Sequence, residues 1–299
     1  MSRSLRLLAP AKVNWTLEVL RLRPDGYHEI RSVLQTIDLC DVVTVKTARG
    51  IELRVDGEAG VLADEAPETN LAYRAAVALR ERCGVRAGAS IMLTKRAPIA
   101  AGLGGGSSDA AAVLRALNEL WGLSQSQQNL MEIAGEIGSD PPFFIAGGTA
   151  AVSKRGDHVE PLRDALAPPM LLATPPAHDR GRKTAAMFGA LTPSEFSDGY
   201  VTIGVRETVE AGRQLSDEHL NNVFERVLST AQPDTELVMD ALRAQGLAPH
   251  LAGAGPAFFL LLHERSDTDA LSQRVRGLGF EPRLTHTLSR IDALCIEEA

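Results

Sequence analysis

Apolar and polar side chains alternate along residues 12–19, near the start of the chain. This period of two predicts a strand with an apolar face and a polar face, because successive side chains of a strand point to opposite sides. Lys12 and Asn14 share the polar face, where their positions are about 7 Å apart. On this pattern alone, a solvent-exposed strand face is the simpler interpretation of the two residues.

The rest of the pattern mixes strand and helix signals. Strands are expected at residues 28–37, 42–46, 51–55, 90–94, 148–153, 170–174, 257–262, 281–285 and 292–296. Helices are expected at residues 70–82, 109–121, 127–137, 200–213, 220–229, 234–245 and 267–277. Thr69 is the expected N-cap of the first helix, and Ser107 or Ser108 that of the second. Mixed charge, glycine and proline at residues 155–169 predict a boundary, so we expect two α+β domains, 1–156 and 157–299.

Composition and charge narrow the classes of function. The chain has 299 residues, of which 44% are hydrophobic and 23% charged, and its formal net charge is -7. An acidic balance argues against binding of a nucleic-acid backbone as the main role. The most apolar stretch, 247–262, contains two prolines and two glycines and is shorter than a membrane span of about 18 residues.

Cysteine usage and the first residues point to a reducing compartment. Cys40, Cys83 and Cys295 are far apart and form no Cys-x-x-Cys pair, which disfavours a disulfide framework and a structural zinc site. No apolar segment of the kind found in secretory signals precedes Pro10. We therefore expect a soluble, cytoplasmic protein without a membrane or nucleic-acid partner.

A glycine-rich loop precedes the second predicted helix. It consists of Pro98, Ile99, Ala100, Ala101, Gly102, Leu103, Gly104, Gly105, Gly106, Ser107 and Ser108. Glycines let the backbone approach a ligand, and a helix N-terminus offers free N–H groups and a positive dipole end, which together suit a polyphosphate. The loop is neither a Walker A motif nor Gly-x-Gly-x-x-Gly, since no Gly-Lys-Ser/Thr follows and Ser107 holds the final position. A flexible strand-to-helix connection is the alternative interpretation.

Three other polar residues are ambiguous when taken singly. Asp140 lies between a predicted helix end and two prolines, where an aspartate is usually a turn or cap residue. Tyr27 and His28 follow a turn at 24–26 and are compatible with a plain hairpin surface. The seven histidines are scattered, and none shows metal-ligand spacing with another.

Considered together, these segments resemble the ordered motifs of the GHMP kinase superfamily. The three main ones are Pro-Ala-Lys-Val-Asn at 10–14, the loop at 98–108 and Gly-Ala-Gly at 253–255. Arg-Pro-Asp-Gly-Tyr-His at 23–28, Gly-Ser-Asp-Pro-Pro-Phe-Phe at 138–144 and the segment 184–188 extend the similarity to a branch that phosphorylates a cytidyl-methylerythritol alcohol. The resemblance covers nearly the whole chain and is weaker from about 155 to 245. It implies a two-domain α+β kinase whose active site lies in the cleft between the domains.

The resemblance also implies roles for individual residues. The loop 98–108 would bind ATP, with Mg²⁺ as the expected cation and Ser108 as a candidate ligand for it. Lys12 and Asp140 would form the catalytic pair that serves transfer of the γ-phosphoryl group to the 2-hydroxyl of the substrate. Both residue types suit phosphoryl transfer, in which a carboxylate can accept the hydroxyl proton and an ammonium can stabilise developing charge. The substrate, which carries cytidine diphosphate, would contact Asn14, Tyr27, His28, Thr184 and Phe188.

The chain departs from the superfamily pattern at a few positions. Ala100 stands where the family loop usually has glycine, and Ala252 and Ala254 replace two serines of the late motif. The missing hydroxyls remove hydrogen bonds that they would give to phosphate or substrate, although backbone N–H groups can still serve. Pro141 replaces a more common valine, and Trp15 a smaller apolar residue that would need less space in the core.

Two alternatives to this function stay open on the sequence. One is a kinase of the same superfamily for another alcohol such as mevalonate or homoserine. The other is a non-catalytic nucleotide-binding regulator that kept the loop but lost turnover. Tyr27, His28 and Phe188 favour a cytosine-bearing substrate over the first alternative, and the presence of Lys12 and Asp140 together argues against the second.

Overall fold

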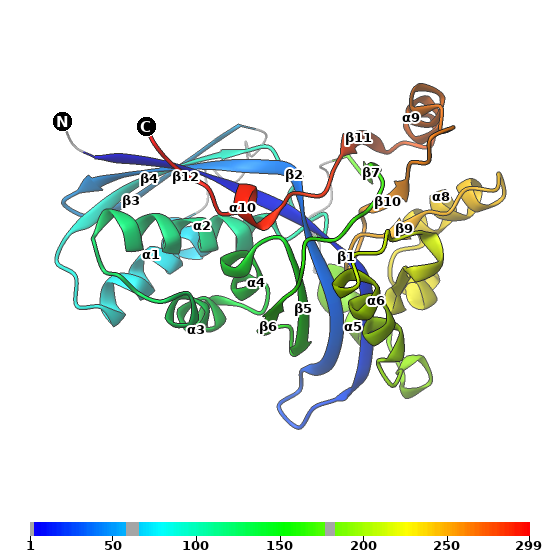
Figure 1. Cartoon of the computed structure of the whole chain (residues 1–299), viewed down its shortest axis with the longest axis horizontal. Coiled ribbons are helices and arrows are strands. Elements are labelled where there is room, and N and C mark those ends of the chain that lie inside the picture. The colour runs from blue at the N-terminus through cyan, green and yellow to red at the C-terminus, as the bar shows by residue number, and fades with distance from the viewer. Residues whose placement is uncertain (1–2, 58–65, 177–182) are drawn as a thin grey trace.

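The computed structural model describes residues 3–57, 66–176 and 183–299. In this part of the chain, an eight-stranded sheet and a four-stranded sheet are combined with helices (Figure 1). The predicted α+β class is confirmed. The predicted division into residues 1–156 and 157–299 stays a prediction.

The longest strands, β1 (Ser4–Leu22) and β2 (His28–Ala48), form an antiparallel hairpin that runs through the whole first sheet. The expected strands 28–37 and 42–46 are one continuous strand. Its residues 42–48 pair with β4 (Gly88–Lys95), and its residues 30–35 pair with β5 (Thr149–Lys154). One long strand therefore pairs with different neighbours at its two ends. The break in its apolar pattern led to the prediction of two separate strands. β3 (Ile51–Gly57) runs parallel to β4, and β6 (His158–Pro161) pairs with β5.

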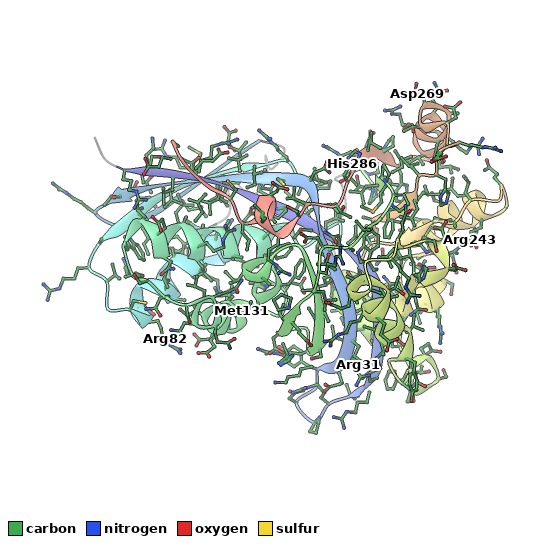
Figure 2. All side chains as sticks on the ribbon, viewed as in Figure 1. Arg31, Arg82, Met131, Arg243, Asp269 and His286 are labelled. Atoms are coloured by element: carbon green, nitrogen blue, oxygen red, sulfur yellow. The ribbon has the colours of Figure 1, made fainter. Side chains whose placement is uncertain are left out.

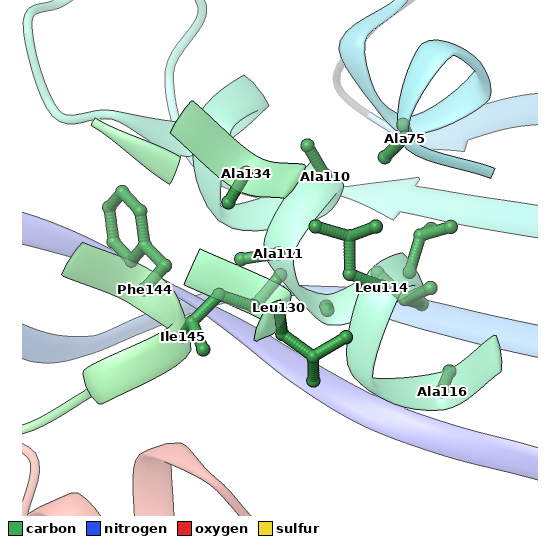
Figure 3. Packing of buried hydrophobic residues seen from close by; sticks show 14 of the residues in the cluster. Ala75, Ala110, Ala111, Leu114, Ala116, Leu130, Ala134, Phe144 and Ile145 are labelled. Carbon is green, nitrogen blue, oxygen red and sulfur yellow. The ribbon is translucent and has the colours of Figure 1, made fainter. Parts of the chain in front are cut away.

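Four helices cover one face of this sheet: α1 (Leu71–Arg82), α2 (Gly105–Leu120), α3 (Gln127–Ile137) and α4 (Pro141–Ala146). Their small and aliphatic side chains interlock in one apolar cluster (Figure 3). Two predicted caps are wrong. Asn70, not Thr69, caps α1 by accepting from the N–H of Ala72 at 2.9 Å. Helix α2 begins after Gly104, so Ser107 and Ser108 lie inside its first turn.

The second sheet has the order β11 (Glu281–Thr285), β7 (Met170–Thr174), β10 (Phe258–Leu261) and β9 (His250–Leu251). The surrounding helices are α5 (Lys183–Ala190), α6 (Tyr200–Glu210), α7 (Leu228–Ala231), α8 (Pro233–Arg243) and α9 (Thr268–Gly277). Short 3-10 turns are η2 (Pro67–Thr69), η3 (Pro193–Glu195), η4 (Asp217–His219) and η5 (Val223–Val227). Among the described helices, none has both the length and the apolarity needed to cross a membrane.

Two expected elements in the second half differ from the structure. The expected helix 220–229 is divided into β8 (Asn221–Asn222), η5 and α7, because β8 pairs with β1 in the first sheet. The expected strand 292–296 is instead the short helix α10 (Arg290–Ala293) followed by β12 (Ile296–Glu298). Ser289 begins that helix by accepting from the N–H of Asp292 at 3.2 Å. β12 then pairs with β1, which returns the chain to the first sheet (Figure 1).

The interior between the two sheets explains why β1 is buried on both faces. On its apolar side, Trp15 is fully buried and meets Phe259 of β10 edge to face, with ring centroids 5.8 Å apart. On its other side, Lys12, Asn14 and Glu18 are 6%, 6% and 1% exposed. The interpretation of this side as a solvated face is wrong, because α6 and the loop at residues 252–255 cover it.

Candidate active site

A cavity of about 1030 Å³ lies where the glycine-rich loop, β1, β2 and α5 meet. Every sequence-predicted site residue except Ser108 lines it: Lys12, Asn14, Tyr27, His28, Pro98, Ile99, Ala100, Ala101, Gly102, Leu103, Gly104, Gly105, Gly106, Ser107, Asp140, Thr184 and Phe188. These residues come from segments up to 176 positions apart, from 12 to 188. The fold therefore places the separate motifs around one space.

The glycine-rich loop is shaped by close backbone contacts. A Cβ at Gly102 would stand 2.5 Å from the carbonyl oxygen of Gly255, and one at Gly104 would stand 2.8 Å from the ring of Phe144. Both glycines have positive φ, which L side chains rarely adopt. Ala100 also has positive φ, at 57°, so the position where the family usually has glycine keeps a glycine-like conformation. Left-handed backbone costs a residue with a Cβ roughly 1–2 kcal/mol.

Lys12 is held between two loops that are distant in the sequence. Its backbone N–H donates to Leu103 O at 3.0 Å, and the N–H of Asn14 donates to Ala252 O at the same distance. The Lys12 ammonium donates to Asn14 Oδ1 at 2.7 Å and to Ala252 O at 3.5 Å. A Cβ at Gly253 would lie 2.5 Å from Lys12 Nζ and 2.8 Å from the backbone oxygen of Gly102, so glycine lets this turn approach both the ammonium and the glycine-rich loop.

Asp140 and Lys12 face the same cavity without direct contact. Asp140 is exposed, precedes α4, and makes no side-chain cap hydrogen bond there. Burial lowers the pKa of Lys12, while the negative charge of Asp140 acts in the opposite direction. The carboxylate is thus free to meet a ligand and is near enough to act electrostatically on the lysine.

The loop at residues 252–255 is fixed by two amides that the sequence did not single out. Asn222 Nδ2 donates to Leu251 O at 3.1 Å and to Gly253 O at 2.8 Å. Gln232 Nε2 donates to Ala254 O at 3.0 Å. The turn is thus held from outside through its carbonyl groups, and its conformation does not depend on the hydroxyls absent at Ala252 and Ala254. No periodicity marks Asn222 or Gln232, because their partners are distant backbone atoms.

A buried cluster of three charges lies directly beneath the glycine-rich loop. Lys95 Nζ donates to Asp41 Oδ2 and, at 2.5 Å, to Asp109 Oδ2, and all three side chains are at most 4% exposed. Asp41 also accepts from the backbone N–H of Ala97 at 2.8 Å. Through Asp109, the cluster links the strand before the loop to the helix after it, just beyond its first turn. Sequence reasoning missed it, although a lysine ending β4 next to the loop was a visible signal.

Burial and the mutual attraction of the charges act against each other in the ionisation of this cluster. Burial raises the pKa of Asp109 to about 7, against the attraction of Lys95. Burial works to lower the pKa of Lys95, but the two carboxylates outweigh it and the pKa is raised. Two carboxylates and one ammonium leave one excess negative charge in the interior. The pKa of Asp109 is raised because protonation of this carboxylate removes that charge.

Aromatic side chains form another wall of the cavity. His28 is stacked on Phe188, with centroids 5.1 Å apart and planes 27° apart, and burial lowers the pKa of the imidazole. Tyr27 is 51% exposed, and the Arg155 guanidinium lies 5.4 Å from its ring centroid. Thr184 and Phe188 lie one helical turn apart on α5. Arg155 also lines the cavity, and the sequence analysis did not identify it.

Oxygen atoms near the start of α2 are the available metal ligands. Ser107 lines the cavity, whereas Ser108 is 1% exposed and its Oγ has no hydrogen-bond partner among the described residues. Asp109 Oδ1 is also buried and unpartnered within the described part of the chain. No group of three or more His, Cys, Asp or Glu that could hold a metal ion occurs among the residues described. Hydroxyl and carboxylate oxygens are ligands that suit Mg²⁺, so these residues fit such an ion.

Comparison with known proteins agrees with this geometry. Residues 70–148 match the family described as GHMP kinases N terminal domain. The chain is 38% identical over 289 residues to the 4-diphosphocytidyl-2-C-methyl-D-erythritol kinase of Dehalococcoides mccartyi, covering 96% of this chain and 100% of that protein. It is 38% identical over 277 residues to the protein of the same name from Bacillus subtilis, covering 90% and 92%.

Solved structures give the same result. A crystal structure of 4-(cytidine 5'-diphospho)-2C-methyl-D-erythritol kinase superposes with a TM-score of 0.75 at 32% identity, covering 95% of this chain and 99% of that one. Homoserine kinase from Cytophaga hutchinsonii has a TM-score of 0.75 at 17% identity, covering 99% and 97%, which supports the fold alone. The resemblance inferred from the motifs is confirmed: the chain belongs to the 4-diphosphocytidyl-2-C-methyl-D-erythritol kinase family of the GHMP kinases.

Proposed function

We propose that this protein transfers the γ-phosphoryl group of ATP to the 2-hydroxyl of 4-diphosphocytidyl-2-C-methyl-D-erythritol, a step of the non-mevalonate isoprenoid pathway. The observation that carries the proposal is the convergence of Lys12, Asp140 and the glycine-rich loop on one cavity that also contains the His28–Phe188 stack. Its volume of about 1030 Å³ is at the upper end of the range for one ligand, roughly 300–1,000 Å³. Such a space suits two substrates side by side.

The phosphates of ATP are assigned to the start of α2. The first turn of this helix offers unpaired N–H groups and the positive end of the helix dipole. On the α1 side, the cavity continues along Asn70, Leu71 and the segment 97–99. A Cβ at Gly106 would lie 3.8 Å from Leu71 Cδ1, so this part adjoins the phosphate loop directly. We assign the adenine base to it.

Lys12 and Asp140 act on the acceptor hydroxyl. Phosphoryl transfer passes through a loose transition state, so the protein contributes mainly position and charge stabilisation. Asp140 accepts the proton of the attacking hydroxyl, an effect typically worth about 10²–10⁴ in rate. The Lys12 ammonium stabilises negative charge that develops on the hydroxyl oxygen and on the transferred group.

The cytidyl group is assigned to the aromatic end of the cavity. Tyr27 offers an exposed ring, and His28, held against Phe188, offers ring nitrogens to the base edge. Thr184 lies on the same side of α5 as Phe188, and Asn14 lies beside Lys12. Arg155 brings a positive charge to this end, which suits the diphosphate of the substrate.

Mg²⁺ is the cation proposed for the reaction. Ser108 is the proposed protein ligand, with its unpartnered Oγ at the start of α2, and the remaining ligands would be phosphate oxygens and water. When bound, the ion neutralises charge on the phosphates of ATP. We also propose that the protein works in the cytoplasm, because its proposed co-substrate ATP is available there.

The test is an ADP-release assay with three alcohols in parallel. The cytidyl substrate should yield ADP at a high rate, whereas mevalonate and homoserine should give only background. Equal or faster turnover of either of these would contradict the proposed substrate. ATP binding without ADP release from any alcohol would favour a non-catalytic nucleotide-binding protein.

A further inference from the structure

A chain of buried polar contacts leads away from Lys12 along β1 and β2. Lys12 Nζ donates to Asn14 Oδ1 at 2.7 Å, and Asn14 Nδ2 donates to Ser32 Oγ at 2.7 Å. Ser32 Oγ in turn donates to the backbone oxygen of Thr16. Ser32 is 0% exposed and does not line the cavity, so it cannot meet a substrate directly. Arg31, its neighbour on β2, marks this region in Figure 2.

The donors and acceptors in this chain permit one arrangement. A lysine ammonium can only donate, so the Asn14 atom facing it must be the amide oxygen. The amide nitrogen therefore points to Ser32 and requires an acceptor. A carbonyl oxygen can only accept, so the single hydroxyl proton of Ser32 goes to Thr16 O and its lone pairs receive the amide. The orientation of the Asn14 amide is thus specified from both sides.

We propose that Ser32 is a positioning residue that fixes the Asn14 amide and, through its oxygen, directs the Lys12 ammonium toward the reacting phosphoryl group. The inference rests on the proposed function. Without the Ser32 hydroxyl, the amide nitrogen loses its fully buried acceptor, and the side chain gains freedom to rotate. Lys12 then loses one of its two fixed partners. Small displacements of a catalytic group have large effects on rate, up to about 10²-fold for 1 Å.

The same interior supplies a matched control. Thr202 of α6 is also buried, and its Oγ1 donates to Thr16 Oγ1 at 2.9 Å. Within the described part of the chain its hydroxyl forms no hydrogen bond with Asn14 or Lys12, and it acts on the side chain of Thr16 rather than on the carbonyl group of that residue. Thr202→Val therefore removes a buried hydroxyl of the same neighbourhood and leaves the Asn14 amide untouched.

The experiment is a double-mutant cycle on kcat. Ser32→Ala should reduce kcat by about tenfold, with the KM for ATP changed by less than about twofold. In an Asn14→Ala background, the same Ser32→Ala substitution should change kcat by less than about twofold, because the group on which Ser32 acts is gone. Thr202→Val should keep kcat within about twofold of the parent. If Ser32→Ala does not fold, Ser32→Cys takes its place, because a thiol is close in size but a weak acceptor.

Two outcomes overturn the inference. One is a variant at Ser32 with unchanged kcat. The other is an equal loss of kcat in the presence and in the absence of the Asn14 amide, since this would mean that Ser32 acts on the fold in general. Failure of the proposed function is distinct from both, because the parent protein would then release no ADP from the cytidyl substrate.

Discussion

The two ends of the cavity are built by different means. At the end to which we assign the phosphates of ATP (the phosphate end), the backbone of the glycine-rich loop is fixed by close approach to Gly255 and Phe144 and by the buried cluster of Lys95, Asp41 and Asp109. At the end to which we assign the cytosine base (the base end), half-exposed side chains such as Tyr27 and His28 form the wall. A polyphosphate is recognised through main-chain N–H groups, whose positions depend on the whole fold, whereas a base is recognised by rings and edges of individual side chains. Substitutions at the phosphate end should therefore reduce stability or turnover. Substitutions at the base end should change only the KM for the cytidyl substrate.

The largest expected effect is on stability at the phosphate end. Lys95→Met leaves Asp41 and Asp109 facing each other in the interior without their common partner. Breaking a buried ion pair in this way costs about 3–5 kcal/mol. The free energy of unfolding, measured by urea denaturation, should fall by that amount. Lys46→Met, at an exposed lysine of β2, is the control and should stay within about 0.5 kcal/mol of the parent. Equal effects in the two variants would contradict a structural role of the cluster.

The second largest effect is expected on turnover, without a change in the affinity for ATP. Asp140→Asn removes the proposed proton acceptor, which makes no cap hydrogen bond of its own. Turnover should fall by about 10² or more while the affinity for ATP stays near that of the parent. Steady-state kinetics and ATP binding measure the two quantities. Asp234→Asn, at an exposed position in the first turn of α8, should leave both unchanged. Turnover of Asp140→Asn within threefold of the parent would remove Asp140 from the role of base.

At the base end, the expected effect is confined to one substrate. Tyr27→Ala removes a ring proposed to stack on cytosine, and each such stack is worth about 1–3 kcal/mol. The KM for the cytidyl substrate should rise by about five- to 150-fold, and the KM for ATP should not change. Tyr200→Ala is the matched control, because Tyr200 is 70% exposed and does not line the cavity. An unchanged KM for the cytidyl substrate would contradict the assignment of this end.

The smallest effect concerns the protonation of His28. Burial lowers its pKa below the ordinary value of 6.5, so the folded state binds fewer protons than the unfolded state over the interval between the two values. The contribution of neutral His28 to the free energy of unfolding is therefore fully present above about pH 6.5 and is lost as the pH falls through the lowered pKa. Because KM is a property of the folded protein, the KM for the cytidyl substrate should stay constant through pH 6.5 and rise a few-fold only as the pH falls through the lowered pKa of His28. In His28→Asn this rise should be absent; its persistence would assign the titration to another group.

Much of the fold could be predicted from the sequence, and so could a set of residues that the structure places around one cavity. The strand at residues 12–19, the helix behind the glycine-rich loop and the motifs that carry Lys12, Asp140 and Phe188 depend on local spacing and residue type, and the structure contains them in one cavity. The local pattern gave wrong predictions where residues distant in the sequence, or the exact hydrogen-bond geometry, determine the structure. Residues 221–222 form a strand because β1 lies beside them, and Asn70 rather than Thr69 caps α1.

The sequence by itself determined where the glycine-rich loop, Lys12, Asp140 and the aromatic residues stand along the chain, and it supplied the prediction that they bind phosphate, serve phosphoryl transfer and hold a base. Only the tertiary structure decided that the polar face of β1 is buried, that Asn222 and Gln232 hold the turn at 252–255, and that Lys95 joins two carboxylates beneath the loop. The physical reason is that residue type sets what chemistry a side chain can perform, whereas burial, charge state and hydrogen-bond partners depend on segments that only folding brings into contact.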